Sequence, residues 1–422
     1  MELATFNQFL AAAVKNGASD VHFKVGSAPA LRVNGQLLPV KVPALQPEDT
    51  NRIAKHLLAS SRYKGALEDL QDWDTSYPLE GVGRFRANIY RNKGHLGAIM
   101  RSIPLQIPDF QKLGLPKTLE TLSQEDRGLI LVTGVTGSGK SSTLAAMVNY
   151  INAHYRKHIV TIEDPIEFVH EDKFSRVMQR EIGPDTPDFS KALRAAMRQD
   201  PDVILVGEMR DAETIEIAIK AAETGHLVLS TVHTQDAYRT INRIIGVFPP
   251  EAQTGVRMRL AENLKGSVSQ RLLPHASGKG RVVAAEIMVS NLSVTEFIKD
   301  PARTHEIKDF LERSHDILGT QSFDQHLVQL LRAGQISVEV AKEAASNPSD
   351  FERALAFEYP FGATQRMRES IALARPSAHE QRGFRPGRGP ALHMQSGRHH
   401  AAVVRCVVAR GDRSRDLLGR EA

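Results

Sequence analysis

The sequence has one cysteine, Cys406, among its 422 residues. One cysteine excludes an intramolecular disulfide and any zinc site built from several cysteines. The chain also lacks an apolar run of the roughly eighteen residues needed to span a bilayer, and its start, MELATFNQFL, has neither the basic region nor the cleavable apolar stretch of a signal peptide. These absences favour a cytoplasmic protein, and the length predicts two or three structural units.

A broad basic surface is missing as well, although the formal net charge is +5. Residues 376–422 contain nine Arg, no Lys and four acidic residues, so the rest of the chain is formally neutral. Because nucleic-acid-binding domains carry basic patches, no nucleic-acid partner is expected. Residues 356–422, rich in Arg, Gly, Pro and His, are predicted to be a disordered basic tail, to which no function is assigned.

What the chain does have is the stretch LILVTGVTGSGKSSTL (129–144), an apolar strand, a G-x-x-x-x-G-K-S loop and the start of an amphipathic helix. Glycines in such a loop let backbone N–H groups surround a phosphate at a helix N-terminus. The lysine reaches the β- and γ-phosphates of a nucleoside triphosphate, and the serine hydroxyl binds Mg²⁺. The sequence therefore predicts a nucleoside triphosphate and Mg²⁺ as cofactors. The predicted nucleotide-binding residues are Gly134, Val135, Thr136, Gly137, Ser138, Gly139, Lys140, Ser141 and Ser142.

Apolar strands alternate with helices after this loop. Strands are expected at 129–133, 158–164, 203–208 and 227–232, and helices near 141–153, 188–199 and 211–223. This order predicts an α/β fold with a mainly parallel sheet, helices on both faces and active residues at the C-terminal strand ends. Val256, Leu260, Leu264 and Val268 repeat every four residues and predict a further helix, with short helices following to about Leu355.

The first part of the chain reads as a small α+β unit. Helices are expected at 5–16 and 47–60, one hairpin turning at Asn34-Gly35 and another turning at 92–94. The predicted organisation is a first domain at 1–104, a linker at 105–118, an ATPase domain with a helical C-terminal segment at 119–355, and the tail at 356–422.

Acidic and histidine motifs end three of the expected strands. TIEDPIEF places Glu163 and Asp164 where one carboxylate could orient a water and another could reach Mg²⁺; the alternative is a solvated acidic strand end. VILVGE ends in Glu208, where the common pattern has Asp. His226 precedes the strand 227–232 and His233 follows it, a spacing that suits contact with a phosphate or carboxylate better than metal binding.

Arginines gather in the second hairpin of the first unit. Period-two alternation places Arg84 and Arg86 on one face of a strand, and Arg91 and Arg101 lie near the hairpin ends. Such arginines are either solvated or stabilise the charge on transferring phosphoryl oxygens.

Several long motifs in order carry a resemblance to a known family. They are ASDVHF, GVTGSGKSS, TIEDPIEFVH, LRAAMRQDPDVILVGEMRDAETI and AAETGHLVLSTVHT. The chain resembles the secretion ATPase superfamily of type II secretion and type IV pilus machines from about Leu3 to Leu355. It is most similar to the pilus retraction ATPases, because it lacks the longer N-terminal domain and the four-cysteine insert of assembly and secretion members.

The resemblance implies a PAS-like first domain, a RecA-like second domain and a ring of six subunits, with ATP as the nucleotide that is hydrolysed. It implies Glu163 as general base, Glu208 as the acid that, with Ser141, holds Mg²⁺, and His226 and His233 as active-site histidines. Arg84, Arg86, Arg91 and Arg101 would complete a neighbouring subunit's site. The implied partners are an inner-membrane pilus platform protein and a paralogous retraction ATPase, with the motor peripheral at the cytoplasmic face of the membrane.

One segment departs from the family pattern. Retraction ATPases carry A-I-R-N-L-I-R-E where this chain is expected to match with SVTEFIKDPAR (293–303), which keeps apolar Phe297 and Ile298 but is interpreted as lacking the first basic position and the terminal acid. Three functions stay open: a motor for pilus retraction, a motor for pilus assembly or secretion, and an accessory subunit that regulates another motor.

Overall fold

The computed structural model describes residues 2–33, 35–59, 61, 63–103, 106–314, 319–358, 392–394 and 406–407. These residues form two compact units, and the chain passes from the first to the second between Leu105 and Gln106. The tail predicted at 356–422 therefore lies mostly outside the described residues. Among the helices that are described, none is long and apolar enough to cross a membrane.

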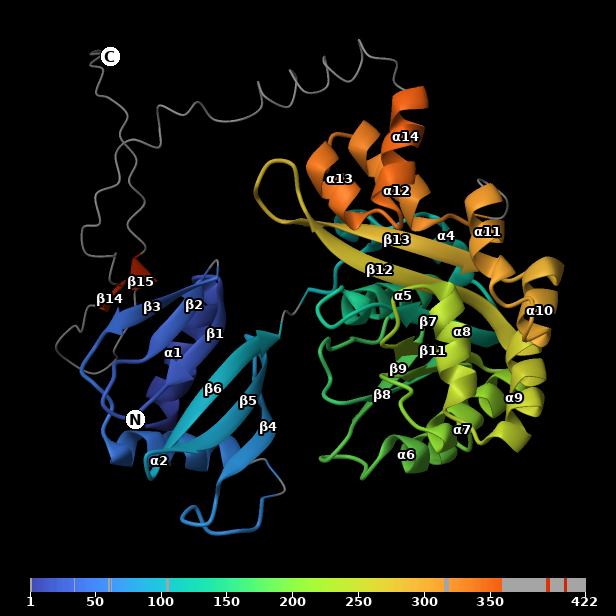
Figure 1. The fold of residues 1–422 in the computed structure, drawn as a ribbon. Helices are drawn as coiled ribbons and strands as arrows, with labels where there is room; N and C mark the ends of the chain where they lie inside the picture. Colours follow the sequence, from blue (N-terminus) through green and yellow to red (C-terminus); the bar gives the residue numbers. More distant parts are fainter. Residues whose placement is uncertain are drawn as a thin grey trace, which may run out of the picture. The chain divides into compact units, whose positions relative to one another are not determined.

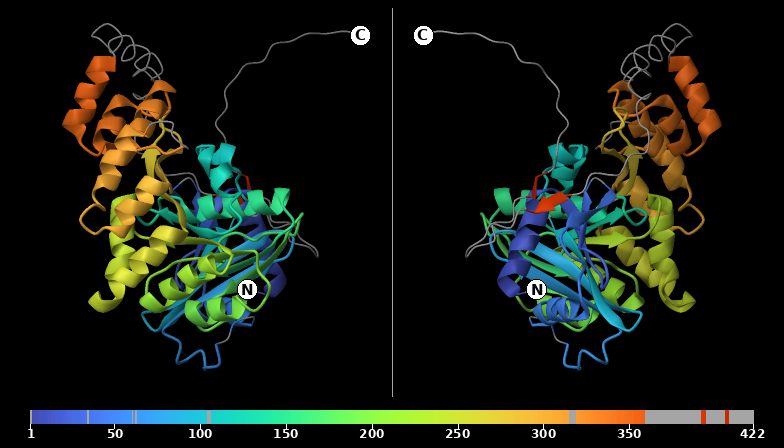
Figure 2. Two further views of the ribbon diagram at one scale, coloured as in Figure 1. Left: turned by 90° about the vertical axis from the view of Figure 1, so that its right-hand side faces the viewer. Right: turned by 90° about the vertical axis from the view of Figure 1, so that its left-hand side faces the viewer.

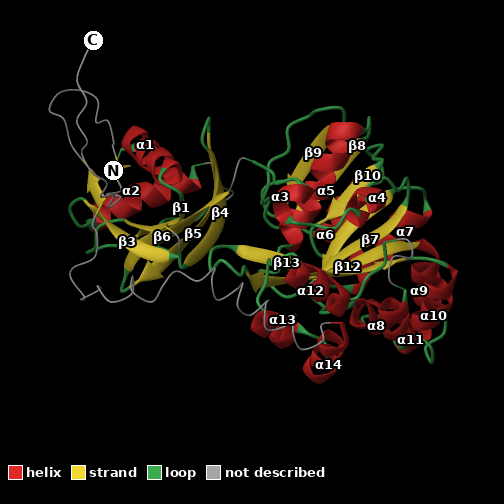
Figure 3. Ribbon diagram, turned by 90° about the horizontal axis from the view of Figure 1, so that it is seen from above, coloured by secondary structure: helices red, strands yellow, loops and turns green. Residues whose placement is uncertain are grey.

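The first unit is a mainly antiparallel sheet with two helices on one face (Figure 3). Its strand order is β15–β14–β3–β2–β1–β6–β5–β4. Phe6 and Leu10 of the first helix and Ile53 of the second pack against Phe85 and Ile89 of the sheet. The elements are α1 (Leu3–Lys15), β1 (Ala18–Phe23), β2 (Ala30–Val33), β3 (Gln36–Lys41), α2 (Pro47–Leu58), β4 (Asp72–Leu79), β5 (Gly83–Asn92), β6 (His95–Ile103), β14 (Leu392–Met394) and β15 (Cys406–Val407).

The predicted helices and hairpins of this unit are confirmed, but three of its strands were not predicted: β4, and the short β14 and β15, which lie in the predicted tail. β4 pairs along its whole length with β5, although its sequence DWDTSYPL has only one aliphatic residue. The hairpin between β5 and β6 turns at Lys93 and Gly94, both with positive φ.

The second unit is built on a seven-stranded sheet in the order β13–β12–β7–β11–β10–β8–β9. Every neighbouring pair is parallel except β12 and β13. The strands are β7 (Gly128–Thr133), β8 (His158–Glu163), β9 (Arg176–Glu181), β10 (Val203–Val206), β11 (Leu227–Val232), β12 (Leu264–Pro274) and β13 (Arg281–Val289). The predicted α/β class with a mainly parallel sheet is confirmed.

Helices cover both faces of this sheet because its central strands are apolar on both sides. Ile130 and Val132 face α3 (Phe110–Leu113), α4 (Thr118–Leu122) and α5 (Lys140–His154), whereas Leu129 and Leu131 face the opposite group. That group consists of α6 (Phe189–Ala196), α7 (Ala212–Glu223), α8 (Ala237–Gly246), α9 (Pro250–Asn263), α10 (Leu292–Lys299) and α11 (Glu306–Arg313).

Three further helices pack on the outer hairpin of the sheet. α12 (Phe323–Arg332), α13 (Val338–Ala344) and α14 (Pro348–Glu358) lie beside β12 and β13 (Figures 1 and 2). The predicted helical C-terminal segment is thus present, but the strands β12 and β13 interrupt it between α9 and α10.

The helix predicted from Val256, Leu260, Leu264 and Val268 was wrong in its second half. α9 ends at Asn263, and Leu264 and Val268 belong to β12. Residues four apart lie on one face of a strand as well as of a helix, so the spacing could not separate the two. The predicted linker at 105–118 also contains structure, because Phe110 and Leu115 pack in the core of the second unit.

Candidate active site

The loop between β7 and α5 has the backbone of a phosphate cradle. Gly134, Gly137 and Gly139 all have positive φ, which favours glycine. At Gly134 a side chain has no room either, because a Cβ there would lie 2.4 Å from Ser138 Oγ. The helix α5 starts at Lys140, so its free backbone N–H groups point into this loop.

The loop residues fit a bound nucleotide. Lys140 is buried and donates to the carbonyl oxygens of Gly134 at 2.9 Å and Val135 at 3.1 Å. Burial lowers the pKa of Lys140, while Glu208 and Glu167 act against the shift. Among the described side chains, Ser138 Oγ is one of few buried polar atoms without a hydrogen-bond partner. Polyanionic phosphates would satisfy both the buried ammonium and the unpartnered hydroxyl.

Glu163 ends β8 and is held by hydrogen bonds. Its Oε1 accepts from Thr161 Oγ1 at 2.6 Å and from Gln179 Nε2 at 3.0 Å. Burial raises the pKa of Glu163, and these two donors act against the shift. A raised pKa brings the carboxyl closer to the range in which it can accept a proton and later return it.

Glu208 follows β10 and sits in a cluster of charges. Arg210 Nη2 lies 2.7 Å from Glu208 Oε2, and His233 Nε2 lies 3.4 Å from Oε1. Burial acts to raise the pKa of Glu208, but the hydrogen bond from Arg210 and the charges of His233, Arg210 and Lys140 hold it below its ordinary value. Glu208 is therefore an anion, as a carboxylate near Mg²⁺ must be.

Glu163, Glu208 and Arg210 line one cavity of about 170 Å³, together with Ser141 of the phosphate loop. The C-terminal ends of β8, β10 and β11 meet there because the strands are parallel and in register. The predicted meeting of the C-terminal strand ends is thus found in the structure. The lining residues include Ser141, Glu163, Asp164, Glu167, His170, Gly207, Glu208, Arg210 and Thr231.

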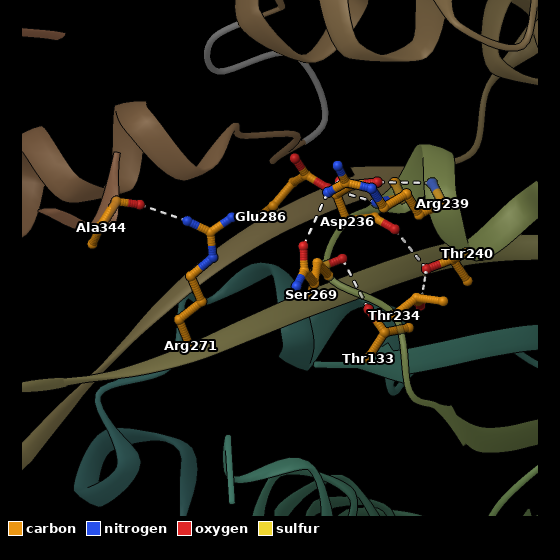
Figure 4. A network of polar contacts seen from close by, with 11 residues as sticks. Thr133, Thr234, Asp236, Arg239, Thr240, Ser269, Arg271, Glu286 and Ala344 are labelled. Atoms are coloured by element: carbon orange, nitrogen blue, oxygen red, sulfur yellow. Dashed lines mark hydrogen bonds and ion pairs between the residues drawn. The ribbon is translucent and has the colours of Figure 1, made fainter. Parts of the chain in front are cut away.

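A polar network joins the end of β7 to β12, β13 and the start of α8 (Figure 4). Thr133, the last residue of β7, donates to Ser269 Oγ at 3.0 Å. Ser269 is paired in register with Glu286, whose Oε1 accepts from the backbone N–H of Ala237 at 2.8 Å. Ala237 is the first residue of α8, so the network joins the phosphate loop to the segment that follows His233.

His226 is not part of this cluster within one chain. It precedes β11, and its Nδ1 lies 2.9 Å from the carbonyl oxygen of Ala221. Its carbonyl oxygen accepts from Gly128, the first residue of β7, whereas the phosphate loop follows the last residue. The length of a six-residue strand, roughly 20 Å, separates the two edges. The structure therefore does not bring His226 together with Glu163, Glu208 and His233.

Three of the four predicted arginines share one face of the first unit. Arg86 and Arg101 are directly paired across β5 and β6, and Arg84 lies two residues before Arg86 on β5. Arg84 donates to Ser76 Oγ at 2.6 Å, and Arg101 Nε pairs with buried Asp20 at 2.9 Å. Arg86 is exposed.

Arg91 has a different environment. Its guanidinium donates to the carbonyl oxygens of Leu67, Glu68, Leu70 and Gly94 at 2.7–3.0 Å. Arg91 is an even number of residues from the buried Phe85, Ala87 and Ile89 of β5. The alternation of the strand therefore places it on the opposite face from Arg84. This geometry indicates that Arg91 holds the loop before β4; its contact with a neighbouring subunit's nucleotide stays a prediction.

Sequence reasoning missed several side chains at the cavity. Arg210 follows Glu208 by two residues, and its position after the strand was the available signal. Gln179 and Thr161 hold Glu163, but Gln179 lies on β9, which was not predicted as a strand. Among the described residues, no group of three or more His, Cys, Asp and Glu side chains could hold a metal by itself.

The fold and the site define a P-loop nucleotide-binding protein of the α/β class. A family model described as "Type II/IV secretion system protein" matches residues 96–357. The chain is 42% identical over 344 residues to the type IV pilus retraction ATPase PilT of Pseudomonas aeruginosa, covering 82% of this chain and 99% of that protein. It is 37% identical over 345 residues to the type IV pilus ATPase PilU of the same organism, covering 82% and 90%.

Solved structures agree with these relatives. The pilus retraction motor PilT with bound ADP superposes with a TM-score of 0.76 at 45% identity, covering 82% of this chain and 98% of that one. The ATPase DotB of Legionella pneumophila superposes with a TM-score of 0.70 at 28% identity, covering 81% and 94%. The chain belongs to the family of type II/IV secretion system proteins. The predicted resemblance to secretion ATPases and the predicted P-loop ATPase fold are confirmed; the PAS-like character of the first unit stays a prediction.

Proposed function

We propose that the protein is an ATP-hydrolysing motor of a type IV pilus machine and that it drives pilus retraction. The observation that carries the proposal is the meeting of Ser141, from the phosphate loop, with Glu163 and Glu208 at one cavity, with His233 beside Glu208. The 42% identity to a pilus retraction ATPase over nearly all of that protein supports the particular machine.

The residues divide the chemistry among them. Lys140 and the backbone N–H groups of residues 134–142 bind the β- and γ-phosphates, and Ser141 and Glu208 hold Mg²⁺, directly or through water. Mg²⁺ would neutralise charge on the phosphate oxygens. Glu163 accepts a proton from the attacking water. His233 lies beside Glu208, so its electrostatic environment changes when the negative charge of the γ-phosphate leaves the site.

The assembly is proposed to be a homo-hexamer in which Arg84, Arg86 and Arg101 reach a neighbouring subunit's nucleotide. Their common face supports this arrangement, and arginine suits it because its planar fork binds phosphoryl oxygens. The motor would act at the inner face of the cytoplasmic membrane on a pilus platform protein, with a paralogous retraction ATPase as a further partner.

An accessory role is the second candidate. The 37% identity to PilU and the altered segment 293–303 favour it. The two candidates differ in turnover: a main motor hydrolyses ATP rapidly by itself, whereas a regulatory subunit does so only in a mixed assembly.

ATP turnover and subunit number, measured on the purified full chain, test the proposal. Glu163→Gln should still bind ATP while its turnover falls on the order of a hundredfold or more, because the shape is kept and the base is lost. Equal loss of binding and turnover would assign Glu163 a structural role. No turnover in the wild-type ring would favour the accessory candidate.

Mixed rings test the arginines. Arg86→Ala and Lys140→Ala rings should each be inactive, because an arginine finger contributes roughly 10³–10⁵ in rate. Rings that contain both variants have some boundaries with an intact phosphate loop on one side and an intact arginine on the other, so they should recover part of the activity. Rings shown to be mixed but still inactive would refute action across the boundary.

A further inference from the structure

The edge strand β9 carries two side chains that bind the loop after Glu163. Gln179 and Glu181 are two residues apart and therefore lie on one face of β9. Glu181 is buried, and its Oε2 accepts from the backbone N–H of Ile166 at 3.3 Å. Gln179 binds the same loop at Phe168 and His170. The loop is thus bound at every second residue from 166 to 170.

Gln179 makes three hydrogen bonds with one carboxamide. Its Nε2 donates to Glu163 Oε1 at 3.0 Å and to the carbonyl oxygen of Phe168 at 2.8 Å. Its Oε1 accepts from the backbone N–H of His170 at 2.8 Å. Both amide N–H groups and the amide oxygen are therefore used, and one of the N–H groups contacts a carboxylate.

The chemistry of the partners fixes the orientation of this amide. A backbone carbonyl can only accept and a backbone N–H can only donate, so exchanging the nitrogen and the oxygen of Gln179 would break both contacts. The group that faces Glu163 must be the NH₂. A donor in that place stabilises the ionised carboxylate over the protonated acid.

We propose that Gln179 is a positioning residue of the active site, whose carboxamide orients the Glu163 carboxylate, keeps it ionised and ties it to the loop 164–170. The proposal rests on the proposed role of Glu163 as general base. In this proposal the polar edge strand β9 contributes to the reaction through Glu163, and Gln179 itself does not contact the nucleotide.

A change in the pH profile should distinguish this role from simple packing. Burial favours the neutral form of Glu163, and the donors Gln179 and Thr161 oppose it. Loss of one donor raises the pKa of the base, so turnover at low pH should fall off earlier. Other titratable or charged groups facing this region are Asp164, Glu167, His170, Glu181, Glu208 and Arg210. They are unchanged in the variants proposed below.

The experiment compares Gln179→Leu with the wild-type hexameric ring. Turnover at pH 7 should fall on the order of tenfold, and the acid limb of the profile should move up by about one to two pH units, as expected for loss of a hydrogen bond to a charged group. The affinity for ADP should stay within about threefold, because Gln179 does not belong to the phosphate loop. Thr161→Val removes the other donor to Oε1 with little change in shape, and it should move the acid limb in the same direction.

A matched control is Gln253→Leu. Gln253 is half-buried like Gln179, but its Nε2 donates to the carbonyl oxygen of Phe248 at 2.9 Å, whereas Gln179 donates to Glu163. The same substitution there should leave the acid limb in place. An equal shift in the control variant would overturn the proposal, as would an unmoved acid limb in both Gln179→Leu and Thr161→Val.

The double variant Glu163→Gln/Gln179→Leu separates this proposal from the one on which it rests. If Gln179 acts through Glu163, adding Gln179→Leu to Glu163→Gln should lower the residual turnover no further. A further tenfold loss would show that Gln179 acts through the fold instead. If Glu163→Gln alone keeps wild-type turnover, the assignment of the base is wrong, whatever Gln179 does.

Discussion

The buried carboxyl of Glu286 makes the stability of the second unit depend on pH. Burial raises its pKa to about 7; the hydrogen bond from Ala237 N–H opposes the shift, as does Arg271, while Asp236 and Asp324 add to it. Glu286 is 8% exposed and belongs to the polar network on β12 and β13 (Figure 4). We expect it to be protonated at pH 5 and largely ionised at pH 8.

The sign of the effect follows from where the proton is bound. In the unfolded chain the carboxyl titrates near 4.5, so between about pH 4.5 and 7 the folded protein binds more protons than the unfolded one. Stability therefore falls as the pH rises through this window and stays lower above it. A difference of about 2.5 pKa units corresponds to about 3 kcal/mol, of which about 2 to 3 kcal/mol is lost between pH 5 and pH 8.

Two buried histidines act in the opposite direction. Burial lowers the pKa of both His170 and His326 from 6.5 to about 4. The unfolded chain then binds more protons between about pH 4 and 6.5, so their contribution to stability falls as the pH drops. The wild-type profile combines these opposing effects, and only a variant of Glu286 isolates its share.

The assay is urea unfolding of the nucleotide-free protein at pH 5 and pH 8, at one protein concentration. Glu286→Gln cannot ionise but keeps an oxygen that accepts from Ala237 N–H. Between pH 5 and pH 8 it should gain about 2 to 3 kcal/mol in unfolding free energy relative to the wild type. Glu262→Gln removes an exposed glutamate of α9 and should follow the wild-type profile. If Glu286→Gln also follows it, Glu286 is not protonated in the folded protein at pH 5.

Three further predictions concern other parts of the molecule. Lys140→Ala should abolish ATP turnover and strongly weaken nucleotide affinity in a binding titration, because the loop loses its buried cation. Arg91→Ala should cost at least about 2 kcal/mol, seen as a lower thermal unfolding midpoint, because four carbonyl oxygens lose their donor; exposed Arg86→Ala should leave the midpoint nearly unchanged. Asp236→Ala removes the N-cap of α8, whose carboxylate accepts from Arg239 N–H, and should cost about 1 kcal/mol in urea unfolding.

The central sheet could be predicted from the sequence because its strands are continuous apolar runs. β7, β10 and β11 are buried at every position, a pattern that only a strand covered on both faces produces. β9 could not be predicted in this way. It is an edge strand with the sequence RVMQRE, and its polar side chains are needed to bind the loop after β8.

The same reasoning explains which of the predicted site residues the structure brings together and which it does not. Glu163, Glu208 and His233 follow the C-terminal ends of parallel strands, so strand direction alone brings them to one edge of the sheet. His226 was grouped with them by its motif, although it precedes its strand. Arg91 was grouped with Arg84 because both lie in the second hairpin, although strand alternation places it on the other face. For both His226 and Arg91, the position of the residue on its strand predicted its environment, whereas the motif in which it occurs did not.

The altered segment 293–303 shows what the fold requires of this region and what it leaves open. Val294, Phe297 and Ile298 of α10 are buried, and buried Arg257 of α9 donates to the carbonyl oxygen of Ile298 and to Thr304 Oγ1. Thr295, at the changed basic position, is only half-buried. Packing therefore accounts for the apolar positions that agree with the family pattern, and it does not constrain the position that differs. A difference between main motor and accessory subunit would then lie in what α10 presents to other proteins, because the side chains proposed here for hydrolysis, Ser141, Glu163 and Glu208, all line the cavity.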